Sequence, residues 1–96
     1  MLITHKSSYT CINVVIDTSG IVSNCNSICF DNAGNVDAKI HINFPTGGYI
    51  LLKSGKSIDL GQRIETIIMD VFKIEFPIVS SGQCVNVIRE TFQILD

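Results

Sequence analysis

The chain has 96 residues, a formal net charge of −2, 46% hydrophobic residues and only 17% charged residues. This composition predicts a folded core and excludes a disordered chain, and the length predicts a single β domain over residues 1–96. The seven Lys and Arg residues are scattered and form no basic stripe, so we do not expect nucleic acid as a partner. There is no signal-peptide core and no apolar run of about 18 residues, so we expect a protein made in the cytosol without a membrane span.

The choice of apolar residues favours strands over helices. The sequence contains 16 Ile and 8 Val but only 5 Leu and 2 Ala. Branching at Cβ restricts the side chain and suits a pleated sheet, whereas Leu and Ala are the better helix formers. We therefore predict an all-β fold, either a small antiparallel β-sandwich or a jelly-roll-like barrel.

The first predicted strand covers residues 9–17, with Ile12, Val14 and Ile16 on one face. The next two segments, 27–30 and 36–44, flank the turn-forming run 31–35, in which Gly34 can adopt a left-handed conformation. We therefore predict a β-hairpin over residues 27–44. Within 36–44, every second residue is apolar over nine positions, which predicts one face against the core: Val36, Ala38, Ile40, Ile42 and Phe44.

Residues 49–53 form a predicted strand that is apolar on both faces, which indicates a central position or an interface. Gly55-Lys56-Ser57 ends like a phosphate-binding P-loop, but such a loop needs a glycine at position 50, which is Ile, and a helix from Lys56 onward. Residues 57–60 instead alternate like another strand. We predict a tight turn at Ser54-Gly55.

Residues 61–70 fit either an extended segment or one short helical turn, and we favour the extended form. Residues 71–76 alternate as a strand that ends at Pro77. Residues 83–95 form another strand after a Ser80-Ser81-Gly82 turn, so we predict a second hairpin over 71–95. The apolar face of 83–95 switches near Val87-Ile88, which predicts a change of register there.

The four cysteines are Cys11, Cys25, Cys29 and Cys84. Their spacing allows two disulfides, or a zinc site with His5 or His41, but it lacks the two close ligand pairs of most structural zinc sites. Without a secretion signal, free thiols are favoured, and Cys11 and Cys84 are expected to be buried. We predict no metal and no cofactor.

The sequence contains no catalytic motif, so we predict no catalytic residues and no enzyme activity. His41 alternates onto the polar face of its strand and is expected to be a surface histidine.

Three segments carry a family resemblance: ILLKSGKSIDL at 50–60, DVFKIEF at 70–76 and SGQCVNVI at 81–88. Their layout resembles small all-β virion proteins of tailed bacteriophages, which are capsid decoration, head-fibre or tail accessory modules. The resemblance implies a compact β-sandwich that docks on a lattice, often as a symmetric oligomer, in a virion assembled in the host cytoplasm. It transfers no functional residue.

We therefore expect a structural protein that binds itself, as a homo-oligomer, or other virion proteins. The alternative is a glycan-binding or other ligand-binding β-sandwich, which usually needs exposed aromatic residues, and the chain has no Trp and only two Tyr. A monomer rarely exposes a large apolar patch. The predicted interface comprises Tyr49, Ile50, Leu51, Leu52, Ile64, Ile67 and Ile68.

Overall fold

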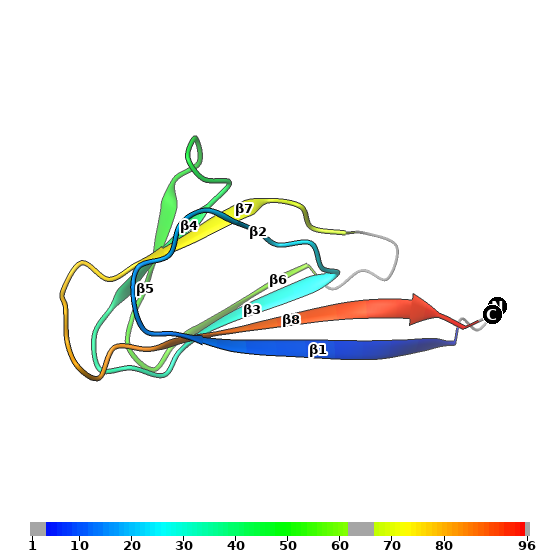
Figure 1. Ribbon diagram of the computed structural model, residues 1–96, viewed down its shortest axis with the longest axis horizontal. Helices are drawn as coiled ribbons and strands as arrows, with labels where there is room; N and C mark the ends of the chain where they lie inside the picture. The colour runs from blue at the N-terminus through cyan, green and yellow to red at the C-terminus, as the bar shows by residue number, and fades with distance from the viewer. Residues whose placement is uncertain (1–3, 62–66, 96) are drawn as a thin grey trace.

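Eight β-strands form the regular structure of residues 4–61 and 67–95, the part of the chain that the computed structural model describes (Figure 1). They are β1 (His5–Val14), β2 (Ile21–Val22), β3 (Ser27–Asn32), β4 (Ala38–Ile42), β5 (Tyr49–Leu52), β6 (Ser57–Gly61), β7 (Val71–Glu75) and β8 (Val85–Ile94). No helix occurs in these described residues, and hence none that could cross a membrane. The prediction of an all-β fold is confirmed.

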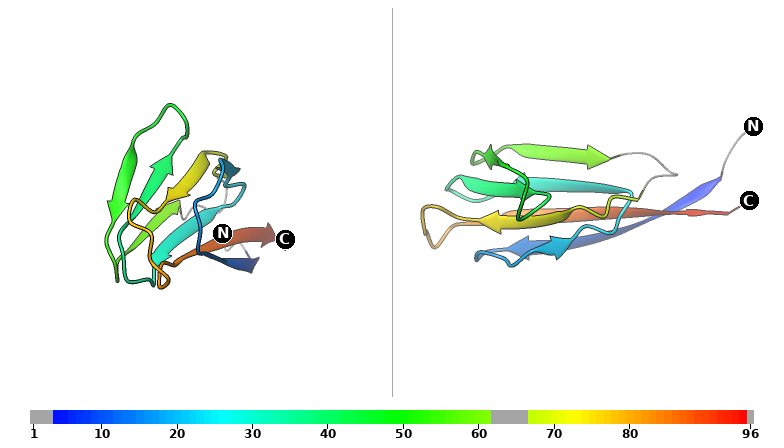
Figure 2. Two further views of the ribbon diagram at one scale, coloured as in Figure 1. Left: turned by 60° about the vertical axis from the view of Figure 1, so that its left-hand side comes forward. Right: turned by 90° about the horizontal axis from the view of Figure 1, so that it is seen from above.

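The strands form two four-stranded sheets that pack face to face (Figure 2). One sheet has the order β1-β8-β3-β6 and the other β2-β7-β4-β5, and every pair of neighbours is antiparallel. The predicted sandwich is therefore present. Its strand order is that of a jelly roll, in which eight strands form two sheets with long connections between them.

The core lies between the two sheets and is built from the inward-facing residues of both. Ile28 and Phe30 of β3 contribute from one sheet, and Ile40 and Phe72 from the other. The rings of Phe30 and Phe72 meet edge to face with centroids 5.2 Å apart, which links the sheets at the centre. Each fully buried aliphatic or aromatic side chain of this kind contributes roughly 1.5–3 kcal/mol of transfer free energy.

Both predicted hairpins are wrong. In the 27–44 segment β3 and β4 lie in different sheets, and in the 71–95 segment β7 and β8 do too. Among the described strands, β4 and β5 are the one consecutive pair joined by hydrogen bonds. The reason is that alternation shows which face of a strand is buried but not which strand lies beside it.

The connection from β3 to β4 crosses between the sheets and packs against the connection from β7 to β8. Gly34 does not adopt the predicted left-handed conformation: among the described glycines, only Gly55 and Gly61 have a positive φ. Its lack of a side chain instead permits close approach to the β7–β8 connection, where an added Cβ would lie 2.7 Å from the Gly82 carbonyl oxygen. Asn35 N donates a hydrogen bond to that same oxygen.

The strand predicted at 9–17 begins earlier and ends at Val14. The chain then turns toward β7, where Asp17 Oδ1 accepts a hydrogen bond from Phe76 N and Thr18 Oγ1 accepts one from Ile74 N. Val14 is buried, but Ile16 lies beyond the strand and is exposed. Hydrogen bonds from the backbone N–H groups of Ile74 and Phe76 to these two side chains therefore replace the last part of the predicted strand.

The predicted register change in the last strand is also wrong. β8 pairs with β1 without interruption from Val85 to Ile94. Val85 and Val87 face the core, whereas Ile88 is on the opposite face, as strict alternation requires. Beyond the end of β3, β1 is the one described strand that pairs with β8, and the two strands extend as a ribbon past the rest of the sandwich (Figure 1).

The turn at Ser54-Gly55 is confirmed, with Gly55 at φ 81° and Lys56 N donating to Lys53 O. Strand β6 follows Lys56 directly, so the helix that a P-loop requires is not formed there. The segment 61–70 was predicted to be extended or to form one helical turn, and its residues 62–66 lie outside the described residues. Within the described part, Ile68 forms an isolated antiparallel bridge with Cys25.

Candidate functional site

The predicted interface strand is the edge strand β5. It lies at the end of the order β2-β7-β4-β5, and β4 is its one partner among the described strands. Tyr49, Ile50 and Leu51 are 53%, 43% and 46% exposed, whereas Leu52 is only 2% exposed. Of the two positions that the sequence allowed for this strand, central or at an interface, the central one is wrong.

Pairing with β4 explains the exposure of each side chain. Ile50 lies opposite Ile40 and Leu52 opposite Ala38, so both point to the core side. Leu52 is covered there, but Ile50 remains partly open because no described strand lies beyond β5. Tyr49 and Leu51 lie opposite His41 and Lys39 and point to the outer face.

The other predicted interface residues are not brought to β5. Ile64 lies outside the described residues, Ile67 is exposed and Ile68 packs partly against the core. The bridge to Cys25 places Ile68 beside the connection from β2 to β3, whereas β5 is at the opposite edge of its sheet. The predicted interface therefore consists of two separate surfaces.

An aromatic cluster stands next to β5 on the outer face of its sheet. The His41 ring lies 5.6 Å from the Tyr49 ring and 5.8 Å from the Phe44 ring, measured between centroids. Lys39 Nζ lies 4.7 Å from the centroid of Tyr49, and Lys73 Nζ lies 5.1 Å from that of Phe44, within the range of cation–π attraction. The Tyr49 ring therefore packs against both His41 and Lys39.

Phe44 was predicted to face the core, and this is wrong. Asn43 has a positive φ of 58°, which ends the alternation of β4 and lets the Phe44 ring join His41. The left-handed conformation is tolerated by Asn better than by most residues. The burial of Ala38 and Ile40, from the same predicted face, is confirmed.

His41 lies on the outer face as predicted, but it is half-buried and paired. Its Nε2 lies 3.1 Å from Glu75 Oε1 on β7. This hydrogen bond, aided by the nearby charges of Lys39, His41 and Lys73, lowers the pKa of Glu75. The pair was missed because the sequence does not reveal that β4 lies between β5 and β7; the alternation of 71–76 placed Glu75 on a polar face but gave it no partner.

The other sheet edges differ from β5. On β6 the side chains directed away from the core belong to Ser57 and Asp59, and a charge on an edge discourages further strand pairing. β2 has only two residues, and β1, the remaining edge, carries the charged Lys6. β5 has neither a proline nor a charge among its four residues, so it is the edge best suited to contact another protein.

The cysteines are unpaired thiols, but one prediction about them is wrong. Cys11 is exposed on β1, Cys84 is half-buried, and Cys25 is the fully buried one. Burial, followed by the hydrogen bond and charge of Asp59 and the charge of Asp31, raises the pKa of Cys29 to about 12. Within residues 4–61 and 67–95, no three His, Cys, Asp or Glu side chains are placed to hold a metal ion.

The fold and this surface define the protein as a jelly-roll β-sandwich with an apolar, unprotected edge strand. No known protein-family model, no curated protein and no solved structure matches the chain.

Proposed function

We propose that the protein is a non-enzymatic structural subunit that assembles with copies of itself through β5. The observation that carries this proposal is the edge strand β5, whose Tyr49, Ile50 and Leu51 are all exposed. An edge strand offers unpaired backbone N–H and C=O groups in addition to its side chains. Exposure of these apolar side chains to water is unfavourable, and contact with a second apolar edge removes them from water.

Two copies of β5 can pair in an antiparallel manner about a two-fold axis. Directly opposed residues must share a face, so the axis has to pass midway between two copies of the same residue. With the two copies of Ile50 opposed across the axis, Tyr49 of each copy lies opposite Leu51 of the other on the outer face. This register opposes no like charges, and it joins two four-stranded sheets into one of eight strands.

We further propose that the assembly belongs to a virion, as a decoration, head-fibre or tail accessory subunit. The support is the family resemblance of segments 50–60, 70–76 and 81–88 together with the jelly-roll strand order, which is frequent in viral capsid domains. Lectin domains share this strand order, and fold alone does not determine function. The binding surface therefore has to be tested directly.

Sedimentation of the purified protein tests self-assembly. We expect the wild-type protein to form dimers or larger closed oligomers, and Leu51→Lys to sediment as a monomer because it places two like charges at the paired edges. Ile78→Lys is the matched control, since Ile78 is also an exposed apolar residue but lies outside β5. A wild-type monomer, or equal dissociation of both variants, would contradict assembly through β5.

Mixing the protein with the products of the genes beside its own tests the virion proposal. We expect it to co-sediment with one of them at a fixed ratio. If it binds none of these proteins and is absent from purified particles, the virion assignment is wrong, whatever the oligomeric state of the isolated chain.

A further inference from the structure

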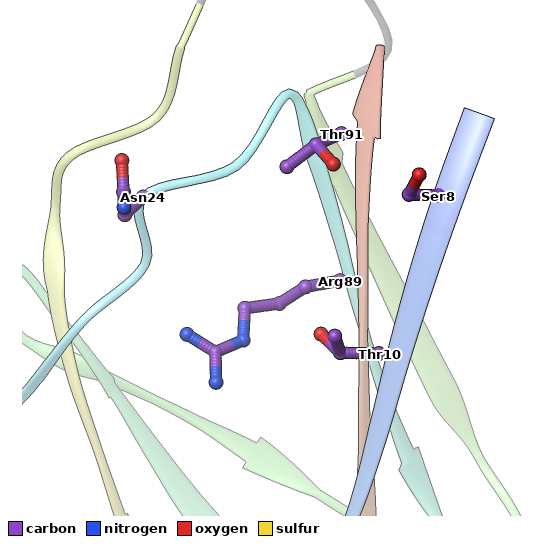
Figure 3. Close-up of a pocket in the computed structure, with 5 residues that line it drawn as sticks. All are labelled: Ser8, Thr10, Asn24, Arg89 and Thr91. Carbon is purple, nitrogen blue, oxygen red and sulfur yellow. The ribbon is translucent and has the colours of Figure 1, made fainter. Parts of the chain in front are cut away.

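A polar pocket borders the core at the end of the sandwich where the β1–β8 ribbon begins to extend past it (Figure 3). Its volume is about 260 Å³, below the roughly 300–1,000 Å³ that accommodates a drug-sized ligand, so its occupant would be small. The pocket is lined by Ser8 and Thr10 of β1, Arg89 and Thr91 of β8, and Asn24 from the connection between β2 and β3.

Strand pairing determines which side chains meet there. Thr10 lies directly opposite Arg89, and Ser8 lies opposite Thr91, so all four point to the same side of the ribbon. This is also the side of Val87, two residues before Arg89 on β8, but here the other sheet no longer covers it. Polar residues thus replace the core at the point where the sandwich ends.

Arg89 is held in place and carries the charge of the pocket. Its Nη1 donates a hydrogen bond to Ser23 O at 3.3 Å, which fixes one arm of the guanidinium group against the β2–β3 connection. Figure 3 shows the side chain reaching from β8 toward the connection that carries Asn24. Among the described residues, no acidic side chain lines the pocket. Glu90 belongs to the opposite face of β8, because neighbouring strand residues alternate. Among the described residues, Arg89 forms no ion pair.

This donor set is suited to one negative charge and several hydroxyl groups. A guanidinium group has five N–H donors in a planar fork that matches a carboxylate, and only one arm is used by Ser23. Three hydroxyl groups and one amide can both donate and accept hydrogen bonds, as the hydroxyl groups of a small polar ligand require. A phosphate with two charges would be matched by only one fixed cation.

We propose that this pocket binds a small hydroxylated carboxylate of the size of a single sugar acid. The site is separate from β5, which lies at the far edge of the other sheet. The ligand would be held by Arg89 through its carboxylate and by Ser8, Thr10, Asn24 and Thr91 through its hydroxyl groups.

Nuclear magnetic resonance titration with glucuronate tests the proposal. We expect amide shifts at the five lining residues at millimolar ligand, and binding at least about tenfold weaker in Arg89→Gln, as for the loss of a charged hydrogen bond. Lys56→Gln is the matched control, because it removes one positive charge from the distant β5–β6 turn and should bind normally. Circular dichroism checks that Arg89→Gln is folded, and Thr10→Val provides a second pocket variant, expected to bind more weakly.

Two further ligands test separately the contributions of the carboxylate and of the hydroxyl groups to binding. Glucose retains the ring hydroxyl groups but lacks the carboxylate, and acetate retains the carboxylate but lacks the hydroxyl groups; both should bind more weakly than glucuronate. Equal binding of either ligand, equal weakening by Lys56→Gln, or no shift at the lining residues would overturn the proposal. The Leu51→Lys variant should bind glucuronate normally, so a failure of this inference is distinguishable from a failure of assembly through β5.

Discussion

Asn32, at the end of β3, is a fully buried polar residue that joins the two sheets. Its Nδ2 donates to Val36 O and to Leu52 O, both at 2.9 Å, and its Oδ1 accepts a hydrogen bond from Gly34 N at 3.1 Å. Leu52 belongs to β5, in the other sheet. One side chain thus fixes the β3–β4 connection and the end of the edge strand.

We expect Asn32→Ala to lower the free energy of unfolding by roughly 2–4 kcal/mol, because three hydrogen bonds are lost from a buried site. Asn32→Asp should also be destabilising, since a carboxylate of similar volume cannot donate to the two carbonyl groups. Chemical denaturation is the measurement. Asn13→Ala, at an exposed position on β1, is the control and should change stability by no more than about 0.5 kcal/mol. Similar values for Asn32→Ala and Asn13→Ala would refute this role.

The cysteines should differ in reactivity toward an alkylating reagent. Only the thiolate reacts, and a pKa of about 12 leaves almost none of Cys29 ionised at neutral or mildly alkaline pH. Burial likewise raises the pKa of Cys25, whereas Cys11 is exposed. Fragment-ion mass spectrometry should therefore show Cys11 modified on the order of tenfold or more faster than Cys25 and Cys29.

Denaturant provides the control for this experiment, because unfolding removes the burial and the neighbouring carboxylates together. All four thiols should then react at similar rates. If Cys29 reacts as fast as Cys11 in the native protein, the arrangement of Cys29 between Asp31 and Asp59 is wrong.

At the scale of elements, β8 holds its sheet together because it lies between β1 and β3. Removing residues 85–96 would detach β1 and also remove Val85 and Val87, which are both fully buried. We expect this truncation to abolish cooperative thermal unfolding, measured by circular dichroism. Removing residues 1–8 is the control, since it deletes only the part of β1 that pairs beyond β3 and leaves 9–14 in place. A cooperative transition in the first variant would contradict the central position of β8.

The pairing of the strands is the part of the fold that the sequence did not predict. The alternation of 36–44 correctly indicated that Ala38 and Ile40 are buried, and that of 71–76 did so for Phe72 and Ile74. It did not reveal that β4 pairs with β7 and β5, since any two alternating strands appear equally compatible. The prediction that Cys11 is buried failed for a related reason. The sequence indicated that Cys11 lies in a strand, but not that its side chain points to the solvent-exposed face of β1.

In the whole molecule, the jelly-roll order pairs the first strand with the last. Apart from β4 and β5, strands that are neighbours in a sheet are far apart in the sequence. The dimensions of 49 × 27 × 17 Å reflect the β1–β8 ribbon, which extends beyond the two packed sheets (Figure 1). The proposed assembly strand β5 and the proposed carboxylate pocket lie in different sheets. One surface can thus be occupied by another subunit while the other binds a ligand.

The sequence by itself determined the all-β class, the turn at Ser54-Gly55, the buried residues of the central strands and the apolar character of β5. These follow from side-chain branching, from period-two alternation and from the conformational freedom of glycine, all of which act over a few residues. Only the tertiary structure decided that β5 is an edge, that His41 meets Glu75, and that Arg89 faces Thr10 and Asn24. Each of these depends on contacts between residues distant in sequence, which local patterns do not encode.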